Sequence, residues 1–321
     1  MPPADTPITT DRARGALLGL AVGDAVGTTL EFRAPGTFDP IDDMVGGGPF
    51  GLRPGQWTDD TSMALCLGHS LVECAGFDAA DQARRYLRWW QEGYLSSTGR
   101  CFDIGGTVRG ALQCFRDSGE PYAGSTDRHS AGNGCLMRLA PVPIFYARHG
   151  AGLATVADRA ADSARVTHGA AECLEASRLF AVLLARLLRG EDRARVLAPG
   201  GLDRDVGGGL AEPRIVALAR GAWRDKSRDD IRGSGYVVES LEAALWCFAR
   251  AGDFREAVLL AANLGDDADT TAAITGQLAG ACWGEAGIPV EWRERLHQGE
   301  EIGALADRLH RVGAASGGTA P

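Results

Sequence analysis

Apolar residues recur at helical spacing along almost the whole of this chain, and the alternating pattern of a half-buried β-strand is nearly absent. Between residues 174 and 187, for example, Leu174, Leu179, Leu183, Leu184 and Leu187 follow this helical spacing. With 321 residues and 45% hydrophobic content, the chain is long enough to bury a full-sized core. We therefore predict an all-α fold, with one compact multi-helix domain over residues 12–311 and special backbone geometry in its glycine-rich connections.

The two ends of the chain differ from the rest in composition. Residues 1–11 are rich in proline and threonine, and residues 312–321 are rich in glycine, alanine and serine, so we expect both segments to be flexible or disordered. Segments 34–56, 118–134 and 198–213 are predicted to be long surface loops. Because loops carry most functional side chains, we expect the active site in loops at the N-termini of helices.

Composition also argues against several locations. The best candidate for a membrane span, residues 170–188, is interrupted by Glu172, Glu175, Arg178 and Arg186. The N-terminus lacks the basic and apolar regions of a signal peptide. The eight cysteines show no CxxC spacing and mostly fall in apolar helical patterns, so we expect small buried thiols in a reducing compartment. These features predict a cytoplasmic protein.

The net charge bears on the choice of partners. A formal charge of −9 argues against general binding to nucleic acid or to anionic membranes, because both need clustered lysine and arginine. A small phosphate-bearing substrate is still compatible, since metal ions and helix N-termini bind phosphate locally.

Two acidic clusters stand about two hundred residues apart, Thr58-Asp59-Asp60-Thr61 and Asp266-Asp267-Ala268-Asp269-Thr270-Thr271, and each directly precedes an apolar, alanine-rich helical run. Neighbouring carboxylates repel by roughly 1–4 kcal/mol at about 4 Å, so such clusters call for a cation. Carboxylate and hydroxyl oxygens favour magnesium, manganese or calcium. Asp267 and Asp269 converge on one ion only from irregular backbone leading into a helix. The alternative is that Asp59 and Asp269 are ordinary N-caps.

Five further features are candidates for function, each with a plainer alternative. Glu31 follows a glycine-rich helix end, where a solvated glutamate is common. Asp103 precedes two glycines and a helix, where it would also serve as an N-cap. The turn Gly132-Asn133-Gly134 enters an apolar segment that we expect to be a helix whose N–H groups can cradle a diphosphate. His168, after Thr167, is a functional candidate whose plainer alternative is a structural histidine. Tyr236 can stack on a planar ligand, and its plainer alternative is a half-buried aromatic at a helix start.

Taken in order, these motifs resemble the ADP-ribosylglycohydrolase family, which includes the dinitrogenase reductase-activating glycohydrolases. The resemblance covers residues 12 to 310 and rests on Gly23-Asp24-Ala25-Val26-Gly27 with Glu31, Trp57-Thr58-Asp59-Asp60-Thr61, Asp103-Ile104-Gly105, Gly132-Asn133-Gly134, Thr167-His168, Tyr236-Val237-Val238, and Asn263-Leu264-Gly265 through Thr270. It implies a compact all-α domain with a binuclear magnesium centre at the bottom of a cleft. The activity that it implies is hydrolysis of the bond between the distal ribose of ADP-ribose and an acceptor.

The resemblance also implies roles for particular residues. It makes Glu31 and Asp103 catalytic, and it makes Gly106, Gly132, Asn133, Gly134, His168 and Tyr236 substrate-binding. Two Mg²⁺ ions, with Mn²⁺ as the alternative, would be held by Thr58, Asp59, Asp60, Asp267, Asp269 and Thr270. The chain departs from the usual family pattern Gly-Gly-Asp-Thr-Asp-Thr, because Asp266 replaces the second glycine and Ala268 the first threonine. We do not count Asp266 as a ligand.

The expected function is therefore magnesium-dependent release of ADP-ribose from a modified protein or small molecule by a monomeric enzyme. Which of Glu31 and Asp103 acts as the general base is left open, as is the acceptor, although Asp103 favours arginine. An isoprenoid synthase is a weak alternative, because Asp59 and Asp60 lack the later acid at helical spacing that such enzymes need. A non-catalytic ADP-ribose-binding or structural protein on the same scaffold is the second alternative.

Overall fold

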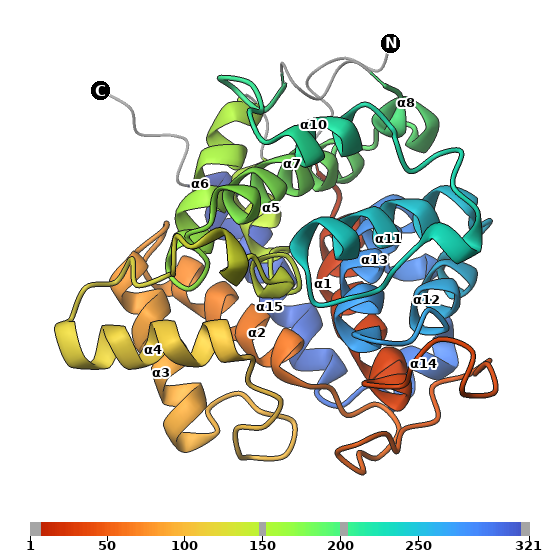
Figure 1. The fold of residues 1–321 in the computed structure, drawn as a ribbon. Helices are drawn as coiled ribbons and strands as arrows, with labels where there is room; N and C mark the ends of the chain where they lie inside the picture. The colour runs from red at the N-terminus through yellow and green to blue at the C-terminus, as the bar shows by residue number, and fades with distance from the viewer. Residues whose placement is uncertain (1–7, 148–151, 200–204, 316–321) are drawn as a thin grey trace.

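The computed structural model describes residues 8–147, 152–199 and 205–315, and within these ranges the chain is helical and contains no sheet (Figure 1). The all-α prediction is therefore confirmed. The α-helices in this part are α1 Thr10–Gly27, α2 Asp59–Glu73, α3 Ala79–Glu92, α4 Gly106–Ser118, α5 Pro141–Tyr146, α6 Leu153–Arg165, α7 Ala171–Leu188, α8 Arg193–Leu197, α10 Pro213–Ala219, α11 Val237–Arg250, α12 Phe254–Ala262, α13 Ala268–Trp283, α14 Val290–Arg295 and α15 Gly299–Ala315. Short 3₁₀ turns include η1 Thr28–Leu30, η2 Arg128–Ser130, η3 Asn133–Cys135, η4 Arg228–Asp230 and η5 Glu285–Gly287.

Helices α1 and α13 form the centre of the molecule and lie side by side in Figure 1. Glycines at every fourth position of α1 face the backbone of α13, and a Cβ added at Gly23 would lie 2.2 Å from the carbonyl oxygen of Ala272. Gly15 faces Gly280 and Gly27 faces Ala268, so the two helices are antiparallel. Close backbone packing therefore brings the C-terminal end of α1 to the N-terminal end of α13, where the second acidic cluster begins.

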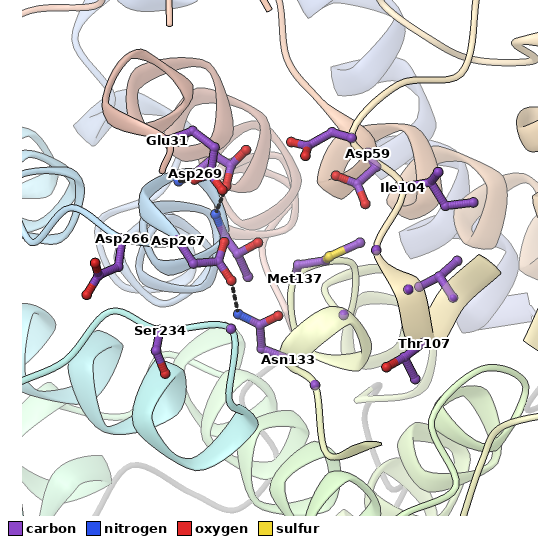
Figure 2. Close-up of a pocket in the computed structure, with 18 of the residues that line it drawn as sticks. Glu31, Asp59, Ile104, Thr107, Asn133, Met137, Ser234, Asp266, Asp267 and Asp269 are labelled. Carbon is purple, nitrogen blue, oxygen red and sulfur yellow. Dashed lines mark hydrogen bonds between the residues drawn. The ribbon is translucent and has the colours of Figure 1, made fainter. Parts of the chain in front are cut away.

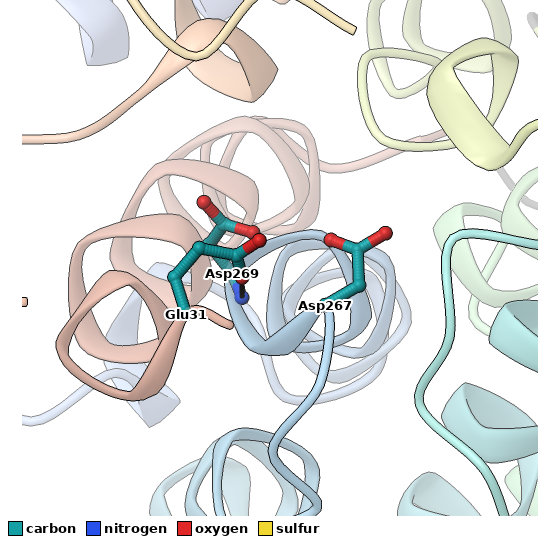
Figure 3. Close-up of side chains that lie close together, drawn as sticks. All are labelled: Glu31, Asp267 and Asp269. Atoms are coloured by element: carbon teal, nitrogen blue, oxygen red, sulfur yellow. Dashed lines mark hydrogen bonds between the residues drawn. The ribbon is translucent and has the colours of Figure 1, made fainter. Parts of the chain in front are cut away.

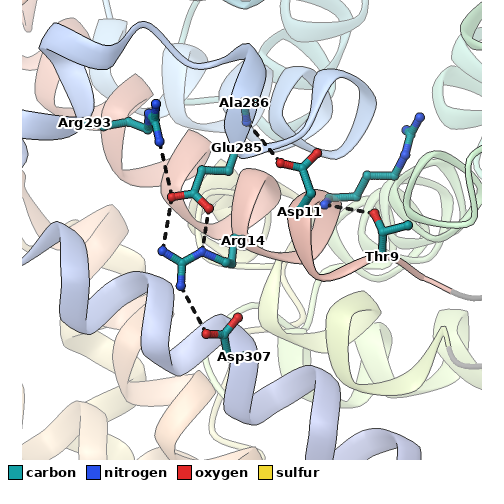
Figure 4. A network of polar contacts seen from close by, with 8 residues as sticks. Thr9, Asp11, Arg14, Glu285, Ala286, Arg293 and Asp307 are labelled. Carbon is teal, nitrogen blue, oxygen red and sulfur yellow. Dashed lines mark hydrogen bonds and ion pairs between the residues drawn. The ribbon is translucent and has the colours of Figure 1, made fainter.

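The opposite end of α1 is tied to the C-terminal part of the chain by a polar network (Figure 4). The Arg14 guanidinium pairs with Glu285 at 2.5 Å and with Asp307 at 3.1 Å. Asp11 accepts a hydrogen bond of 3.1 Å from the backbone N–H of Ala286. Helix α1 thus begins at Thr10, inside the segment 1–11 that we expected to be flexible, and α15 continues to Ala315, inside the expected tail 312–321. Residues 1–7 and 316–321 lie outside the described residues.

Two other expectations need correction or restatement. Cys66, Cys135, Cys173 and Cys247 are buried as predicted, but Cys74 and Cys114 are exposed, because Cys74 ends α2 and Cys114 lies on the solvent face of α4. The described helices include none that is long and apolar enough to cross a membrane.

Candidate active site

The first turn of α2 is held by a carboxylate from α1. Asp24 is completely buried and accepts hydrogen bonds from the backbone N–H groups of Thr58 (2.9 Å) and Thr61 (3.0 Å) and from the hydroxyl of Thr61 (2.6 Å). The first N–H groups of a helix have no partner within the helix, and an N-cap side chain usually accepts from them. Asp24 takes this role for α2, although it lies on the neighbouring helix α1. Sequence analysis quoted Asp24 only as part of a glycine-rich motif and gave it no role.

The N-cap alternative for the acidic clusters is wrong. The N-cap of α2 is Thr58 and that of α13 is Asp267, and neither makes a side-chain capping bond. Asp59 and Asp269 instead lie within the first helical turns. Their carboxylates are therefore available for contacts across the helices.

The two acidic clusters meet in space. The Thr270 hydroxyl donates to Asp60 Oδ1 at 3.2 Å, and the Thr58 hydroxyl lies 3.3 Å from Asp269 Oδ2. All six residues expected to hold metal are thus gathered at the start of α2 and α13, with Asp59 and Asp267 lining the same cavity as Asp269.

Glu31, which follows α1 and η1, joins this corner. Its Oε2 accepts hydrogen bonds from the backbone N–H groups of Ala268 (2.8 Å) and Asp269 (3.3 Å), at the positive end of α13. Oxygens of Glu31, Asp267 and Asp269 lie within 4.8 Å of one another (Figure 3). The packing of α1 against α13 therefore places this glutamate against the second acidic cluster.

The carboxylates strongly perturb one another. Burial, together with repulsion from neighbouring acids, raises the pKa of Asp59, Asp60 and Asp269 well above the usual range of an aspartate. Burial, with repulsion from Asp267, raises the pKa of Glu31 to about 8. Burial likewise raises the pKa of Asp103 to about 7. Such a cluster is poised either to take up protons or to bind a cation.

The donor set fits a hard divalent cation. Asp60 Oδ2 is buried and has no hydrogen-bond partner among the described residues. A buried acceptor is rarely left unsatisfied, so this oxygen is available to bind a cation. Within the described part of the chain, neither lysine nor arginine lines the cavity, so no side-chain cation there balances the acids. All six side chains offer oxygen, the ligand that Mg²⁺ and Mn²⁺ prefer.

A cavity of about 690 Å³ opens above this corner (Figure 2). It is lined by eleven of the residues singled out from the sequence, namely Glu31, Asp59, Asp103, Gly106, Gly132, Asn133, Gly134, His168, Asp267, Asp269 and Thr270. Thr58 and Asp60 lie in the wall behind it. Tyr236 does not line this cavity but a neighbouring one of about 800 Å³, which shares Thr107, Gly132 and Gly235 with the first.

The turn at residues 132–134 is anchored on both sides of the cavity. Asn133 Nδ2 donates to Asp267 Oδ2 at 2.8 Å and to the Ser240 hydroxyl at 3.1 Å, and its backbone N–H donates to the carbonyl of Gly235. The turn does not enter a helix directly, as we expected. It forms the 3₁₀ turn η3, and the next helix, α5, begins only at Pro141.

His168 is buried against this turn, and its tautomer follows from a chain of hydrogen bonds. Arg138 donates to the Thr167 hydroxyl at 2.6 Å, which leaves that hydroxyl to donate to His168 Nδ1 at 2.8 Å. This arrangement favours the tautomer with the ring proton on Nε2, the nitrogen on the side of Gly134. Burial and the Arg138 charge lower the pKa of His168 to about 3, so the ring stays neutral.

Three non-glycine residues that line the cavity have left-handed backbone: Phe32 (φ 61°), Asp103 (φ 59°) and Asp266 (φ 57°). Asp103 is therefore not the N-cap of α4, which is Gly105. Phe32 and Asp266 are paired, since the Phe32 N–H donates to the Asp266 carbonyl and the Asp266 N–H to the Arg33 carbonyl, both at 2.8 Å. Left-handed non-glycine residues cost about 1–3 kcal/mol each and concentrate at functional sites. Sequence analysis gave Phe32 no role.

The neighbouring cavity carries side-chain charges of both signs. Arg128, His129 and Arg214 line it, together with Glu172 and Glu212. The Tyr236 hydroxyl donates to Glu172 at 2.6 Å and accepts from Arg214 at 3.2 Å, so this ring is held by two charged neighbours.

The structure is an all-helical domain in which two acidic helix starts face a glycine-lined cavity, and these features are the ones expected of the family that the sequence resembles. A model of the family described as ADP-ribosylglycohydrolase matches residues 5–318, and the chain belongs to that family. It is 48% identical over 93% of its length, and 78% of the relative's, to "ADP-ribosylarginine hydrolase Tri1" of Pseudomonas putida. It is 33% identical to "ADP-ribosyl-[dinitrogen reductase] glycohydrolase" of Rhodospirillum rubrum, over 89% of this chain and 90% of the relative's.

A solved structure titled "ADP-ribosylglycohydrolase-related protein complex" superposes with a TM-score of 0.82 at 45% identity, covering 95% of this chain and 98% of that one. The family resemblance seen in the sequence is therefore confirmed, and the protein is a glycosidic-bond hydrolase that acts on ADP-ribosyl groups. The isoprenoid synthase alternative is wrong. The cytoplasmic location and the monomeric state stay predictions.

Proposed function

We propose that this hydrolase releases ADP-ribose from the guanidinium group of arginine and that it needs two divalent cations, Mg²⁺ or Mn²⁺. The observation that carries the metal requirement is the buried, unpartnered Asp60 oxygen in a corner where acids from two distant segments converge. The acceptor is supported by the relatives named ADP-ribosylarginine hydrolase, at 48% identity in Pseudomonas putida and 44% in Serratia proteamaculans.

Six side chains would hold the metal: Thr58, Asp59 and Asp60 from the start of α2, and Asp267, Asp269 and Thr270 from the start of α13. When bound, divalent cations supply Lewis-acid charge at the ribose hydroxyls and at an attacking water. Asp24 positions Thr58, and Asn133 positions Asp267, because each makes hydrogen bonds to the residue concerned. These two residues keep the acidic corner in one arrangement.

Glu31 and Asp103 are the proton-transfer candidates. Both line the cavity, and in the metal-free protein burial raises the pKa of each above the usual range of a carboxyl group. Breaking a ribosyl bond needs a group that protonates the departing nitrogen and a group that takes a proton from water. Glu31 and Asp103 fit these two roles, and the pH dependence of turnover in variants of each residue would show which acid takes which role.

The remainder of the substrate would be held by the turn and the second cavity. His168 and residues 132–134 line the first cavity. Arg128 and Arg214 line the adjoining cavity with Glu172 and Glu212, and the two arginines would bind the diphosphate there. An ADP-ribosyl group spanning both cavities would therefore place its distal ribose over the acids.

The test is ADP-ribose release from ADP-ribosyl-arginine, with matched serine-linked substrate, after treatment with chelator and after adding Mg²⁺ back. We expect activity only with the metal, and a loss of at least about a hundredfold in Asp269→Ala. Asp39→Ala, in an exposed position of the loop 34–56, is the control and should retain activity. Unchanged turnover after chelation would refute the metal requirement, and cleavage of the serine-linked substrate alone would refute the arginine acceptor.

A further inference from the structure

The pair formed by Phe32 and Asp266 stands at the mouth of the active-site cavity and takes no part in the acidic corner. The Phe32 side chain is exposed although it is large and apolar, with 67% of its surface accessible. The Asp266 carboxylate points away from those of Asp267 and Asp269 (Figure 2). Among the described residues, none forms a hydrogen bond or an ion pair with the Asp266 carboxylate.

The backbone of this pair is strained and yet firmly held. Both residues have positive φ, a conformation that aspartate tolerates and that is unusual for a bulky residue such as phenylalanine. Reciprocal main-chain hydrogen bonds of 2.8 Å link residues 32–33 to residue 266, and both Phe32 and Asp266 line the same cavity. A glycine at either position would relieve the strain, so packing alone does not account for these side chains.

Two more aromatic rings extend the surface from one catalytic candidate to the other. The ring of Phe50 lies 6.2 Å from that of Phe32, edge to face, and 5.2 Å from that of Phe102. Phe32 directly follows Glu31, and Phe102 directly precedes Asp103. Phe32 lines the cavity, and Phe50 and Phe102 pack behind it between the chain positions of the two acids that would act on the bond to the acceptor.

We infer that Phe32 and Asp266 form the acceptor subsite and select a guanidinium cation, with the ring face against its plane and the carboxylate as its counter-charge. An exposed aromatic face attracts a planar cation through its quadrupole, and a free carboxylate accepts the N–H donors of a guanidinium. A neutral serine acceptor offers neither feature. The inference rests on the proposed function, because it supplies the physical reason for the arginine preference.

The test compares two ligands that differ only in the acceptor, ADP-ribosyl-agmatine and free ADP-ribose. Their dissociation constants are measured by calorimetry in a Glu31→Gln background, so that the result does not depend on turnover. We expect Phe32→Leu and Asp266→Asn each to raise the dissociation constant of ADP-ribosyl-agmatine by about three- to fivefold. The dissociation constant of free ADP-ribose should stay within about twofold of its value in the Glu31→Gln background. Phe32→Tyr, which keeps a ring face, should restore the affinity.

Tyr122→Leu and Asp39→Asn are the matched controls, because both change exposed side chains of the same types outside the cavity, and both should leave the two constants unchanged. Equal weakening of both ligands would show a structural role for Phe32 and Asp266 and would overturn the inference, as would unchanged binding of both. Failure of the proposed function has a different signature, since wild-type protein would then release no ADP-ribose from the arginine-linked substrate.

Discussion

The carboxylate of Asp24 on α1 accepts a hydrogen bond of 2.6 Å from the hydroxyl of Thr61 on α2, and both residues are buried. This bond joins two helices at the point where the first acidic cluster begins. Asp24 is therefore a positioning residue. Its removal would act on the active site indirectly, by disturbing the start of α2.

Asp24→Ala should lower the free energy of unfolding by about 3–5 kcal/mol, because it leaves several buried donors at the start of α2 without an acceptor. Urea denaturation measures the change. Asp78→Ala is the matched comparison, since Asp78 is an ordinary N-cap that accepts from Asp81 at 2.7 Å, and it should lose only about 1 kcal/mol. Equal losses in the two variants would contradict the special position of Asp24.

Gly23→Ala should destabilise the protein by about 1–3 kcal/mol and reduce activity at the same time. The added Cβ would meet the Ala272 carbonyl at 2.2 Å, so α1 and α13 must separate and carry Glu31 away from Asp269. Gly110→Ala is the control, because Gly110 lies in α4 with no atom within 4 Å of the added Cβ. The free energy of unfolding of Gly110→Ala should rise by about 0.5 kcal/mol, because alanine has a better helix propensity than glycine. Thermal unfolding and turnover are measured for both variants, and equal stability and turnover in the two would contradict the prediction.

Mg²⁺ should raise the melting temperature of the wild-type protein in proportion to the logarithm of its concentration once the sites fill, because a ligand that binds only the folded state stabilises it. Asp60→Asn should abolish this rise while leaving a folded protein, since it removes one negative charge from the buried corner. Asp39→Asn should show the wild-type rise. A full Mg²⁺ response in Asp60→Asn would argue against Asp60 as a ligand.

His168 should stay neutral, with its proton on Nε2, throughout the range in which the protein is folded. The folded-state pKa of about 3 lies below the ordinary value of 6.5, so the stability linked to this residue is fully present above about pH 6.5. That stability is lost as the pH falls towards 3. Nitrogen chemical shifts of the ring report the tautomer, and the difference in unfolding free energy between wild type and His168→Gln should shrink on acidification. A ring that titrates near pH 6.5 would contradict the buried, Arg138-facing geometry.

The helical fold and the two acidic clusters could be predicted from local signals in the sequence, whereas Glu31, Asp103 and His168 were assigned roles only through the family resemblance. Helical spacing indicates the fold, and an acid before an alanine-rich run indicates an oxygen-rich helix start. The glycines of α1 that the motif contains pack closely on α13, as the approach of Gly23 to Ala272 shows.

What escaped prediction depends on contacts between distant segments. Asp24 is separated by more than thirty residues from the threonines that it holds, and only the packing of α1 on α2 brings them together. Tyr236 matches a family motif but lines the second cavity, at a point where residues 132 and 236, far apart in the chain, form an isolated antiparallel bridge. The strain at Phe32 is invisible in the sequence, since phenylalanine usually avoids positive φ.

The glycine contact between α1 and α13 runs from Gly15 to Gly27, roughly 18 Å at 1.5 Å per residue. Because backbone meets backbone at these glycines, we expect a displacement of α1 to carry α13 with it. The Arg14 ion pairs with Glu285 and Asp307 hold the end of α1 that lies far from the active site. Catalytic geometry is thereby exposed to substitutions at the opposite end of the molecule, and random mutagenesis for altered turnover would find them there.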